Sequence, residues 1–210
     1  GTTKRTQLSA YRNTRKGGNI AITLEEGDEL AWVQRTSGSD ELIIATQKGM
    51  AIRFAETDLR PVGRNAMGVR AVRLEEDDQV VGMAKAAEGG TLLTVTQSGQ
   101  GRRTALDQYR LQFRGGKGIR NYDTQEKDTL VAAVMTVQEE DDVILISDDG
   151  VIIRIPAAQI NLQSRYGGGV RVMRVAEGSR VVSVARVPGE EDDPGEGPET
   201  PDAPEPPEGE

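Results

Sequence analysis

The chain has 210 residues, of which 34 are acidic and 26 are basic, so its formal net charge is −8. It contains no cysteine and no histidine, which excludes disulfides, zinc fingers, imidazole general bases and cysteine nucleophiles. No apolar run approaches the length of a membrane span, so no membrane contact is predicted. The hydrophobic fraction of 36% is adequate for a core only if neighbouring parts of the chain share it.

A short glycine-led segment occurs in four copies, each with an arginine at its fifth position. The segments are Gly1-Thr-Thr-Lys-Arg5-Thr, Gly49-Met-Ala-Ile-Arg53-Phe, Gly99-Gln-Gly-Arg-Arg103-Thr and Gly150-Val-Ile-Ile-Arg154-Ile. A period of about fifty residues is typical of propeller-like or stacked repeats, in which one unit cannot bury its own apolar face. We therefore predict a repeat domain over residues 1–187, with copies that begin near residues 1, 49, 99 and 150.

A second landmark, here named the hexad loop, follows in each copy. The four hexad loops are Arg15-Lys-Gly-Gly-Asn-Ile20, Arg64-Asn-Ala-Met-Gly-Val69, Arg114-Gly-Gly-Lys-Gly-Ile119 and Arg165-Tyr-Gly-Gly-Gly-Val170. Their fifth position holds Asn19, Gly68, Gly118 or Gly169, and these residue types tolerate a left-handed backbone. The sequence therefore predicts the same turn in all four copies.

Between the landmarks the sequence predicts short strands rich in Val and Ile, and no window has a 3.6-residue period long enough for a helix. In the second copy the expected strands are residues 42–46, 50–54, 69–74 and 80–85. The predicted fold is all-β, with about four blades of four antiparallel strands and longer connections that cross the outer edge. The first copy lacks the strand that precedes its landmark elsewhere, so the chain is expected to be a fragment with an incomplete first blade.

Charge is unevenly distributed along the chain. Residues 188–210 hold ten of the 34 acidic residues, seven of the nine prolines and no Lys or Arg, so this acidic tail is predicted to be disordered. The tail is expected either to compete with a bound polyanion or to act as a solubilising appendage. Two acidic runs, residues 75–78 and 139–142, are expected at matching repeat positions as solvated turns.

Basic residues gather in the same half of every copy, and the acids occupy the other half. If each copy is one blade, this phase predicts a basic edge. Twenty of the 26 cations are arginines, which suit bidentate contacts to phosphate. Aromatic residues make up only 3% of the chain, and single-strand binders need aromatic stacking platforms, so duplex nucleic acid is the expected partner.

Two kinds of cation are distinguished within this basic half. The fifth-position arginines Arg5, Arg53, Arg103 and Arg154 share one strand position, where cross-strand or inter-blade pairs with carboxylates are an alternative to phosphate contacts. The other cations are expected to face solvent and a ligand: Lys4, Arg12, Lys16, Arg102, Arg110 and Lys117.

The stretch Gln112-Phe-Arg-Gly-Gly-Lys-Gly118 places two cations among three glycines directly before a strand. Glycine N–H groups and the two cations together suit a phosphate backbone, and a plain tight turn is the alternative. The spacing of a nucleotide-binding P-loop is absent. The complete set of candidate DNA-binding residues is Lys4, Arg5, Arg12, Arg15, Lys16, Arg64, Arg102, Arg103, Arg110, Gln112, Arg114, Gly115, Gly116, Lys117, Gly118, Arg120, Arg165 and Arg171.

These residues and motifs make the sequence resemble the C-terminal domain of the A subunit of bacterial DNA gyrase over nearly all of residues 1–187. The stretches that carry the resemblance are Gly1-Thr-Thr-Lys-Arg-Thr, Gly27-Asp-Glu-Leu30, Ala45-Thr-Gln-Lys-Gly-Met-Ala-Ile-Arg-Phe54, Arg60-Pro-Val-Gly-Arg64, Gly101-Arg-Arg-Thr104, Tyr109-Arg-Leu-Gln-Phe-Arg-Gly-Gly-Lys-Gly118 and Gly150-Val-Ile-Ile-Arg154. The acidic tail is also a feature that this family often carries.

The resemblance implies a β-pinwheel of six blades that exchange strands and wrap duplex DNA around a basic outer edge, which supports negative supercoiling. The family's hallmark box, Gln-basic-Arg-Gly-Gly-basic-Gly, lies in its first blade. Residues 112–118 match the box except that Phe113 replaces a basic residue, and by chain order they belong to a later blade.

The resemblance further implies that this fragment has no catalytic residue, metal or cofactor of its own, because ATP and Mg²⁺ belong to other parts of the holoenzyme. The implied partners are the rest of the gyrase A protein and the gyrase B protein in an A2B2 heterotetramer, in the cytoplasm on the bacterial chromosome. Two alternatives stay open. The C-terminal domain of topoisomerase IV has the same fold with degenerate boxes, and a protein-binding propeller would explain the period but not the basic edge.

Overall fold

The computed structural model describes residues 1–13 and 16–189. The acidic tail was predicted to be disordered, and its residues 190–210 lie outside the described residues. The chain forms short strands and four single-turn 3-10 helices, which confirms the all-β prediction. The strands are β1 (Thr2–Thr3), β2 (Glu41–Thr46), β3 (Met50–Ala55), β4 (Val69–Arg70), β5 (Val80–Lys85), β6 (Thr91–Thr96), β7 (Gln100–Ala105), β8 (Ile119–Arg120), β9 (Val131–Val137), β10 (Asp142–Ser147), β11 (Ile152–Pro156), β12 (Val170–Arg171) and β13 (Val181–Val187), and the 3-10 helices are η1 (Leu8–Tyr11), η2 (Glu56–Asp58), η3 (Leu106–Gln108) and η4 (Ala157–Gln159).

The strands form four antiparallel sheets, whose strand orders are β5-β2-β3-β8, β12-β7-β6-β9, β11-β10-β13 and β1-β4. The two central sheets therefore have the four strands that the sequence predicts. Each is built on a hairpin, β2-β3 or β6-β7, with Ile44 opposite Ile52 in the first and Leu93 opposite Arg103 in the second. The last sheet has three strands, so the prediction of four strands per blade is wrong there, whereas the first has two, in line with the incomplete first blade that the sequence predicts.

Each of the first three blades receives a short strand from the next copy. Strand β8 of the third copy pairs with β3 of the second, and β12 of the fourth copy pairs with β7 of the third. These exchanged strands contain only two residues, so the strand predicted over residues 69–74 is too long. The reason is that the amides of Ala71 and Val72 both turn to the carbonyl of Gly1, at 2.9 and 3.3 Å, instead of continuing the ladder.

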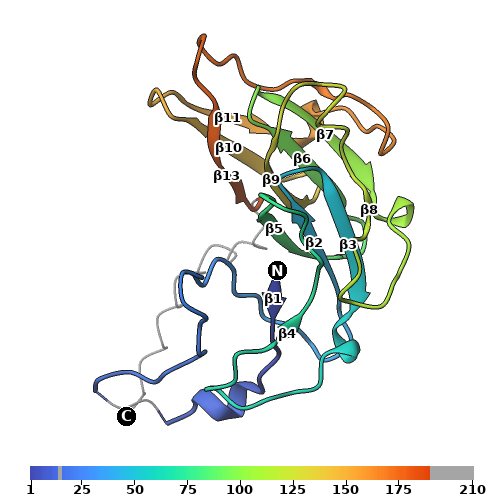
Figure 1. Ribbon diagram of the computed structural model, residues 1–210. Helices are drawn as coiled ribbons and strands as arrows, with labels where there is room; N and C mark the ends of the chain where they lie inside the picture. Colours follow the sequence, from blue (N-terminus) through green and yellow to red (C-terminus); the bar gives the residue numbers. More distant parts are fainter. Residues whose placement is uncertain (14–15, 190–210) are drawn as a thin grey trace, which may run out of the picture.

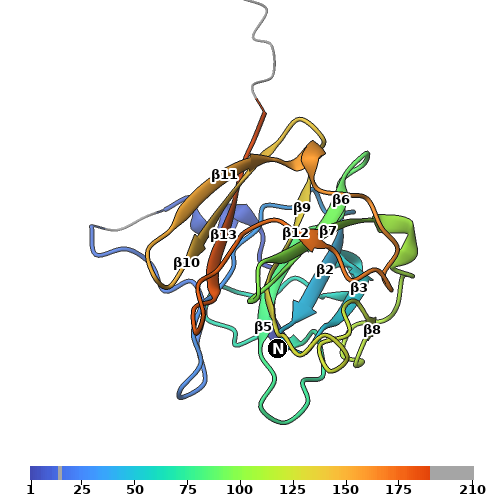
Figure 2. The same cartoon turned by 90° about the horizontal axis from the view of Figure 1, so that it is seen from above.

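The sheets follow one another along an arc. Strands β5, β9 and β13 lie next to one another on its inner side, whereas β3 and β8 lie on the opposite, outer side (Figure 1). The view from above shows β10, β11 and β13 as a layer separate from that of β2 and β3 (Figure 2). The connections after β3, β7 and β11 contain the 3-10 turns, and each connection runs beside the preceding blade, as the parallel bridge between Arg53 and Leu111 illustrates.

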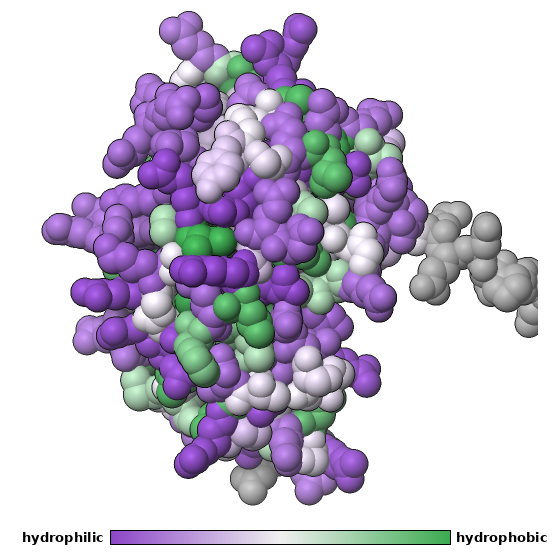
Figure 3. All heavy atoms as spheres, turned by 90° about the vertical axis from the view of Figure 1, so that its right-hand side faces the viewer, coloured by the Kyte–Doolittle hydropathy of each residue, from purple (hydrophilic) through white to green (hydrophobic). Residues whose placement is uncertain are grey.

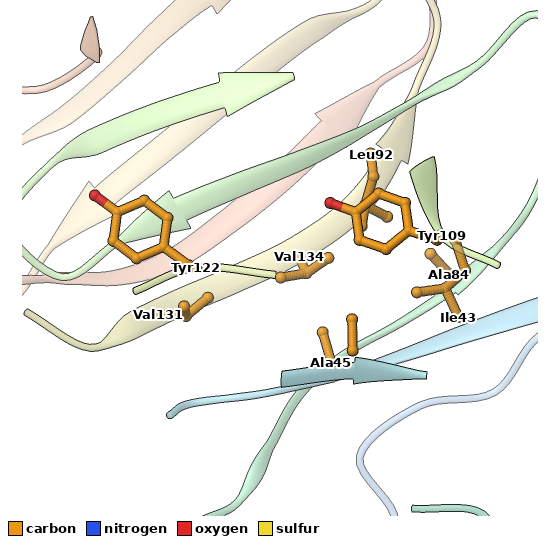
Figure 4. Packing of buried hydrophobic residues seen from close by; sticks show 9 residues of the cluster. Ile43, Ala45, Ala84, Leu92, Tyr109, Tyr122, Val131 and Val134 are labelled. Atoms are coloured by element: carbon orange, nitrogen blue, oxygen red, sulfur yellow. The ribbon is translucent and has the colours of Figure 1, made fainter. Parts of the chain in front are cut away.

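The hydrophobic core lies between the sheets. On β2, Ile43 and Ala45 face the third copy and pack against Leu92 and Val134 (Figure 4). The alternate residues of β2 belong to a second cluster on the opposite face, as the two-residue period of a strand requires. Strand β10 is buried on one face only, because no described blade follows it. A blade of this fold is therefore stable only beside a neighbour, as the repeat predicts.

The first copy forms no strand over residues 16–40 of the described chain. Residues 30–36 correspond in repeat position to β5, but the copy has no equivalent of β2 for them to pair with. Their apolar side chains consequently stay exposed, with Leu30 at 52% and Val33 at 78%. The prediction of an incomplete first blade is consistent with this geometry.

The two acidic runs do not occupy matching positions, which corrects the sequence-based expectation. Residues 75–78 lie between β4 and β5, whereas residues 139–141 lie between β9 and β10 and residue 142 begins β10. Asp141 is only 1% exposed and pairs with Arg186 at 2.7 Å, so the second run is partly structural. No helix in the described part of the chain has the length and apolarity needed to cross a membrane.

Candidate nucleic-acid interface

The exchanged strands place an arginine on the outer edge of three successive sheets. Arg70, Arg120 and Arg171 are each the last residue of a two-residue strand, and all three are exposed. Arg120 pairs with Asp123 at 2.8 Å, and neither of the others forms an ion pair with a described residue. Arg70 is absent from the sequence-based candidates, although its repeat position matches that of Arg120 and Arg171 and could have identified it.

A second series of exposed cations lies in the connection that precedes the hexad loop in the first three copies. Arg12, Arg60 and Arg110 hold matching positions in the first three copies, and Arg60 is the member that the sequence-based candidates omit. Lys16 is exposed, and so are Arg73 and Arg174, two further residues that were not predicted. Arg15 lies outside the described residues.

The first residue of the hexad loop has a structural contact in the second, third and fourth copies. Arg64 and Arg114 donate a hydrogen bond from Nη1 to the carbonyls of Ile20 and Arg70, at 3.1 and 2.8 Å, and Arg165 donates to the carbonyl of Arg120. In each case the acceptor lies in the preceding copy, at the end of its hexad loop or one residue beyond. These half-buried arginines therefore fasten one blade to the next, and only part of each guanidinium remains available to a ligand.

The backbone of residues 112–118 is held by the second copy. The amide of Gln112 donates to the carbonyl of Arg53 at 2.8 Å, and the carbonyl of Gly116 accepts from the amide of Arg73 at 2.8 Å. The amide of Gly115 donates to the carbonyl of Ala71 at 2.6 Å, which corrects the expectation that it faces an anion. The side chain of Gln112 is half-buried, and its amide nitrogen Nε2 has no hydrogen-bond partner among the described residues.

In the second, third and fourth copies the backbone requires a glycine at the fifth hexad position. Gly118 has a φ of 80°, and a Cβ atom there would lie 2.3 Å from the carbonyl oxygen of Ala51. The predicted left-handed turn is present at Gly68, Gly118 and Gly169, but in the first copy the positive φ belongs to Gly18 and not to Asn19. Only a residue without Cβ lets the exchanged strand approach its partner this closely.

Lys117 is exposed but is not an isolated charge. Its side chain is 57% exposed, and its Nζ lies 3.0 Å from Oε1 of Glu75 in the acidic turn of the second copy. The hydrogen bond from Lys117, and then its positive charge, lower the pKa of Glu75. The acidic turn of residues 75–78 therefore reaches the loop of residues 112–118, here named the basic loop, so acidic and basic residues are less separated in space than their segregation along the sequence predicts.

Arg102 was predicted to face solvent, and this prediction is wrong. Its side chain is 0% exposed and forms no salt bridge with a described residue. Its nitrogens donate to the carbonyls of Gly167 and Arg165 at 2.9 Å, to that of Asn121, and to the hydroxyl of Thr104 at 2.8 Å. Burial lowers the pKa of the guanidinium.

The guanidinium of Arg102 also lies 5.5 Å from the centre of the Tyr122 ring. It supports the hexad loop of the fourth copy from inside, because Gly167 and Arg165 belong to that loop. Lys4, at the same repeat position, likewise donates to the carbonyls of Gly63 and Arg64 in the second copy. Neither side chain is oriented as a freely exposed ligand contact.

The fifth-position arginines also hold structural contacts. Arg5 pairs with Glu56 at 3.3 Å between copies, and Arg154 pairs with Asp142 at 2.6 Å across β10 and β11. Arg53 forms an ion pair with Glu41 on β2. Arg103 is 8% exposed and donates to the carbonyl of Ile160 at 2.8 Å, so it too is unavailable to DNA. The carboxylate-pair alternative therefore holds for Arg5, Arg53 and Arg154.

The exposed arginines of the exchanged strands, together with those of the connections that precede the hexad loops, form a row of positive charge along the outer side of the arc. The face that carries β8 is mainly hydrophilic, with apolar side chains in small groups (Figure 3). Among the described residues there is no group of three or more His, Cys, Asp or Glu side chains that would hold a metal ion. A row of this kind suits an extended polyanion better than a small ligand.

The successive sheets with exchanged strands define a propeller-like repeat domain, a β-pinwheel. The family model of the DNA gyrase C-terminal domain, beta-propeller, matches residues 1–37, 40–87, 90–136 and 141–188. The chain belongs to this family, which confirms the resemblance seen in the sequence.

Similar proteins agree with this assignment. The chain is 57% identical to the A subunit of DNA gyrase from Halalkalibacterium halodurans over 92% of its length and 23% of that protein. It is 37% identical to the A subunit of DNA gyrase from Escherichia coli strain K12 over 92% of its length and 22% of that protein. The chain thus spans less than a quarter of these relatives.

Solved structures show the same architecture. The C-terminal domain of DNA topoisomerase IV matches with a TM-score of 0.83 and 26% identity, over 89% of this chain and 59% of that one. The DNA gyrase A C-terminal domain matches with a TM-score of 0.73 and 27% identity, over 81% of this chain and 58% of that one.

Proposed function

We propose that this chain binds duplex DNA without sequence preference and wraps it around the outer edge of the arc. In the parent enzyme it is an accessory domain of the ATP-dependent type II topoisomerase, and it supports negative supercoiling. The observation that carries the proposal is the repeated exposed arginine of the exchanged strands, Arg70, Arg120 and Arg171. Its position recurs from blade to blade, so contacts to a phosphate backbone are spread along a curved path.

Spread contacts are what a bent duplex requires. Bending a duplex of 20–30 base pairs by 40–90° costs about 1–6 kcal/mol, and a single loop does not supply this energy. A second series, Arg12, Arg60 and Arg110, adds charge in the same order along the chain.

The rest of the gyrase A protein and the gyrase B protein are the proposed protein partners, and the site of action is the bacterial chromosome in the cytoplasm.

The C-terminal domain of topoisomerase IV is the second candidate, because its structure matches with the higher of the two TM-scores, 0.83 against 0.73. Sequence favours gyrase, since the relatives at 57% and 45% identity are both gyrase A proteins. The two candidates share DNA binding and differ in how strongly they wrap. Relaxation of a plasmid by a type I topoisomerase in the presence of the chain distinguishes them, because only a chain that wraps leaves trapped supercoils.

Binding of the full chain to a duplex of random sequence is expected to weaken steeply as salt increases. If about five or six phosphates are neutralised, the plot of log affinity against log salt has a slope near −5, from about −0.9 per contact. Fluorescence anisotropy at several salt concentrations measures this slope. A slope near zero would refute the proposed function, and a protein-binding propeller would then be the better interpretation.

Replacing Glu75 with glutamine is expected to tighten DNA binding at low salt, because it frees Lys117 from its ion pair. Loss of an exposed ion pair of this kind is expected to increase DNA affinity about twofold to fivefold. The matched control is Glu88→Gln, which makes the same change in net charge at an exposed residue outside the hexad loops. Equal effects of the two variants would show that only net charge matters and that Lys117 does not contact DNA.

A further inference from the structure

Phe113 is the most exposed of the large apolar side chains in the described residues, at 85%. Burying an exposed aromatic ring against a ligand is favourable, but a single exposed apolar side chain is ordinary, so the surroundings of Phe113 must indicate the ligand. The ring lies inside the basic loop, between Gln112 and Arg114, and four residues before Lys117.

The loop holds Phe113 in place through its neighbours. On one side, the amide of Gln112 donates to the carbonyl of Arg53 at 2.8 Å. On the other side, Arg114 donates to the carbonyls of Asp58 and Arg70, at 3.2 and 2.8 Å. Both flanking residues are thus fixed to the preceding copy, so the ring is presented by a supported backbone and little further ordering is needed when it binds.

Packing of the blade does not require an aromatic residue here. The corresponding positions in the second and fourth copies are Gly63 and Ser164, and both are exposed. The repeat therefore leaves this position open to solvent in each of these copies, and only the third fills it with an apolar side chain. If the fold required an aromatic side chain at this position, the second and fourth copies would have one as well.

The charges around Phe113 indicate the chemistry of what covers it. The backbone amide of Arg73 donates a hydrogen bond to the carbonyl of Gly116 in the same loop, and the carbonyl of Arg70 accepts one from Arg114. The side chains of Arg70 and Arg73 are both exposed. An apolar ring in a loop whose own residues and bonded neighbours include cations suits a ligand that combines phosphate with flat apolar surfaces. Duplex DNA has both, since its bases are stacked between two charged backbones.

We infer that Phe113 is an apolar wedge that enters the minor groove of the bound duplex and partly unstacks one base step. This inference rests on the proposed function and adds a contact that is not electrostatic. Apolar side chains inserted between base pairs kink DNA, and flexible pyrimidine–purine steps unstack most easily. The third blade would then fix where the wrapped DNA bends, and TA steps would be favoured at that place.

The test uses the full chain and a duplex of about 30 base pairs with one central TA step, in which the adenine is replaced by 2-aminopurine. Binding of the unchanged chain is expected to increase 2-aminopurine fluorescence, because the base loses a stacking neighbour. Phe113→Ala should abolish this increase and lower affinity about tenfold, equivalent to about 1.4 kcal/mol. The slope of log affinity against log salt should stay the same, because no phosphate contact is removed.

Two variants complete the experiment. Phe113→Leu keeps an apolar wedge and should restore most of the fluorescence increase, whereas Leu30→Ala removes an apolar side chain that is 52% exposed in the acidic half of the first copy and should change nothing. If Phe113→Ala binds DNA with unchanged affinity and unchanged fluorescence, the wedge is refuted while DNA binding stands, and a protein partner is the remaining ligand class. If the unchanged chain does not bind DNA, the proposed function fails and the wedge fails with it.

Discussion

Replacing Arg102 with alanine is expected to lower the free energy of unfolding by about 3–5 kcal/mol, because buried carbonyls lose their donors at about 1–3 kcal/mol each and a cavity remains. The acceptors left without a partner belong to Gly167, Arg165 and Asn121. Removal of a buried charge offsets part of this loss. Unfolding in urea, followed by circular dichroism, measures the change.

Two further variants make the result interpretable. Arg102→Lys keeps the charge but not the planar set of donors, so an intermediate loss is expected. Arg171→Ala changes an exposed arginine and should leave stability within about 0.5 kcal/mol. An Arg102→Ala chain that unfolds at the same urea concentration as the unchanged chain would contradict the supporting role assigned to the guanidinium.

Replacing Arg70, Arg120 and Arg171 together with alanine is expected to give the largest loss of DNA affinity. Each phosphate contact accounts for about 0.9 of the salt slope, so the slope should fall from about −5 to about −2. Between 1 M and 0.1 M salt each phosphate contact increases the affinity by about 0.9 of an order of magnitude. Loss of three contacts should therefore lower the affinity at 0.1 M salt by about two to three orders of magnitude. The same anisotropy titration provides both numbers.

The matched control removes three solvent-accessible cations that pair with carboxylates and lie outside the exchanged strands. These are Lys85, Arg154 and Arg180, which pair with Asp40, Asp142 and Asp148. Because these cations lie outside the proposed path along the exchanged strands, little change in slope is expected. If both triple variants lose affinity equally, DNA does not follow the exchanged strands, and the proposed path along the outer edge is wrong.

The amino-acid sequence was sufficient to predict the features that depend on local properties of the chain. Strands β2 and β5 lie within one residue of their predicted ranges, because short runs of Val and Ile between turn residues specify a strand in any context. The turn at Gly118 was predictable because only glycine adopts a positive φ at no cost. The repeat itself indicated the blades, and through them the need for neighbours to complete the core.

The tertiary structure alone decided which basic residues are available to a ligand. Arg102 and Arg110 lie in the same basic half of the third copy, yet the first is 0% exposed and the second is exposed. The reason is that strand exchange brings the hexad loop of the fourth copy over β7, where its carbonyls need donors that Arg102 supplies. Glu75 reaches Lys117 from 42 residues away for the same reason. The positions of basic residues within the repeat predict a basic edge. Which of these residues are buried or paired depends on contacts between copies, and no local sequence pattern specifies those contacts.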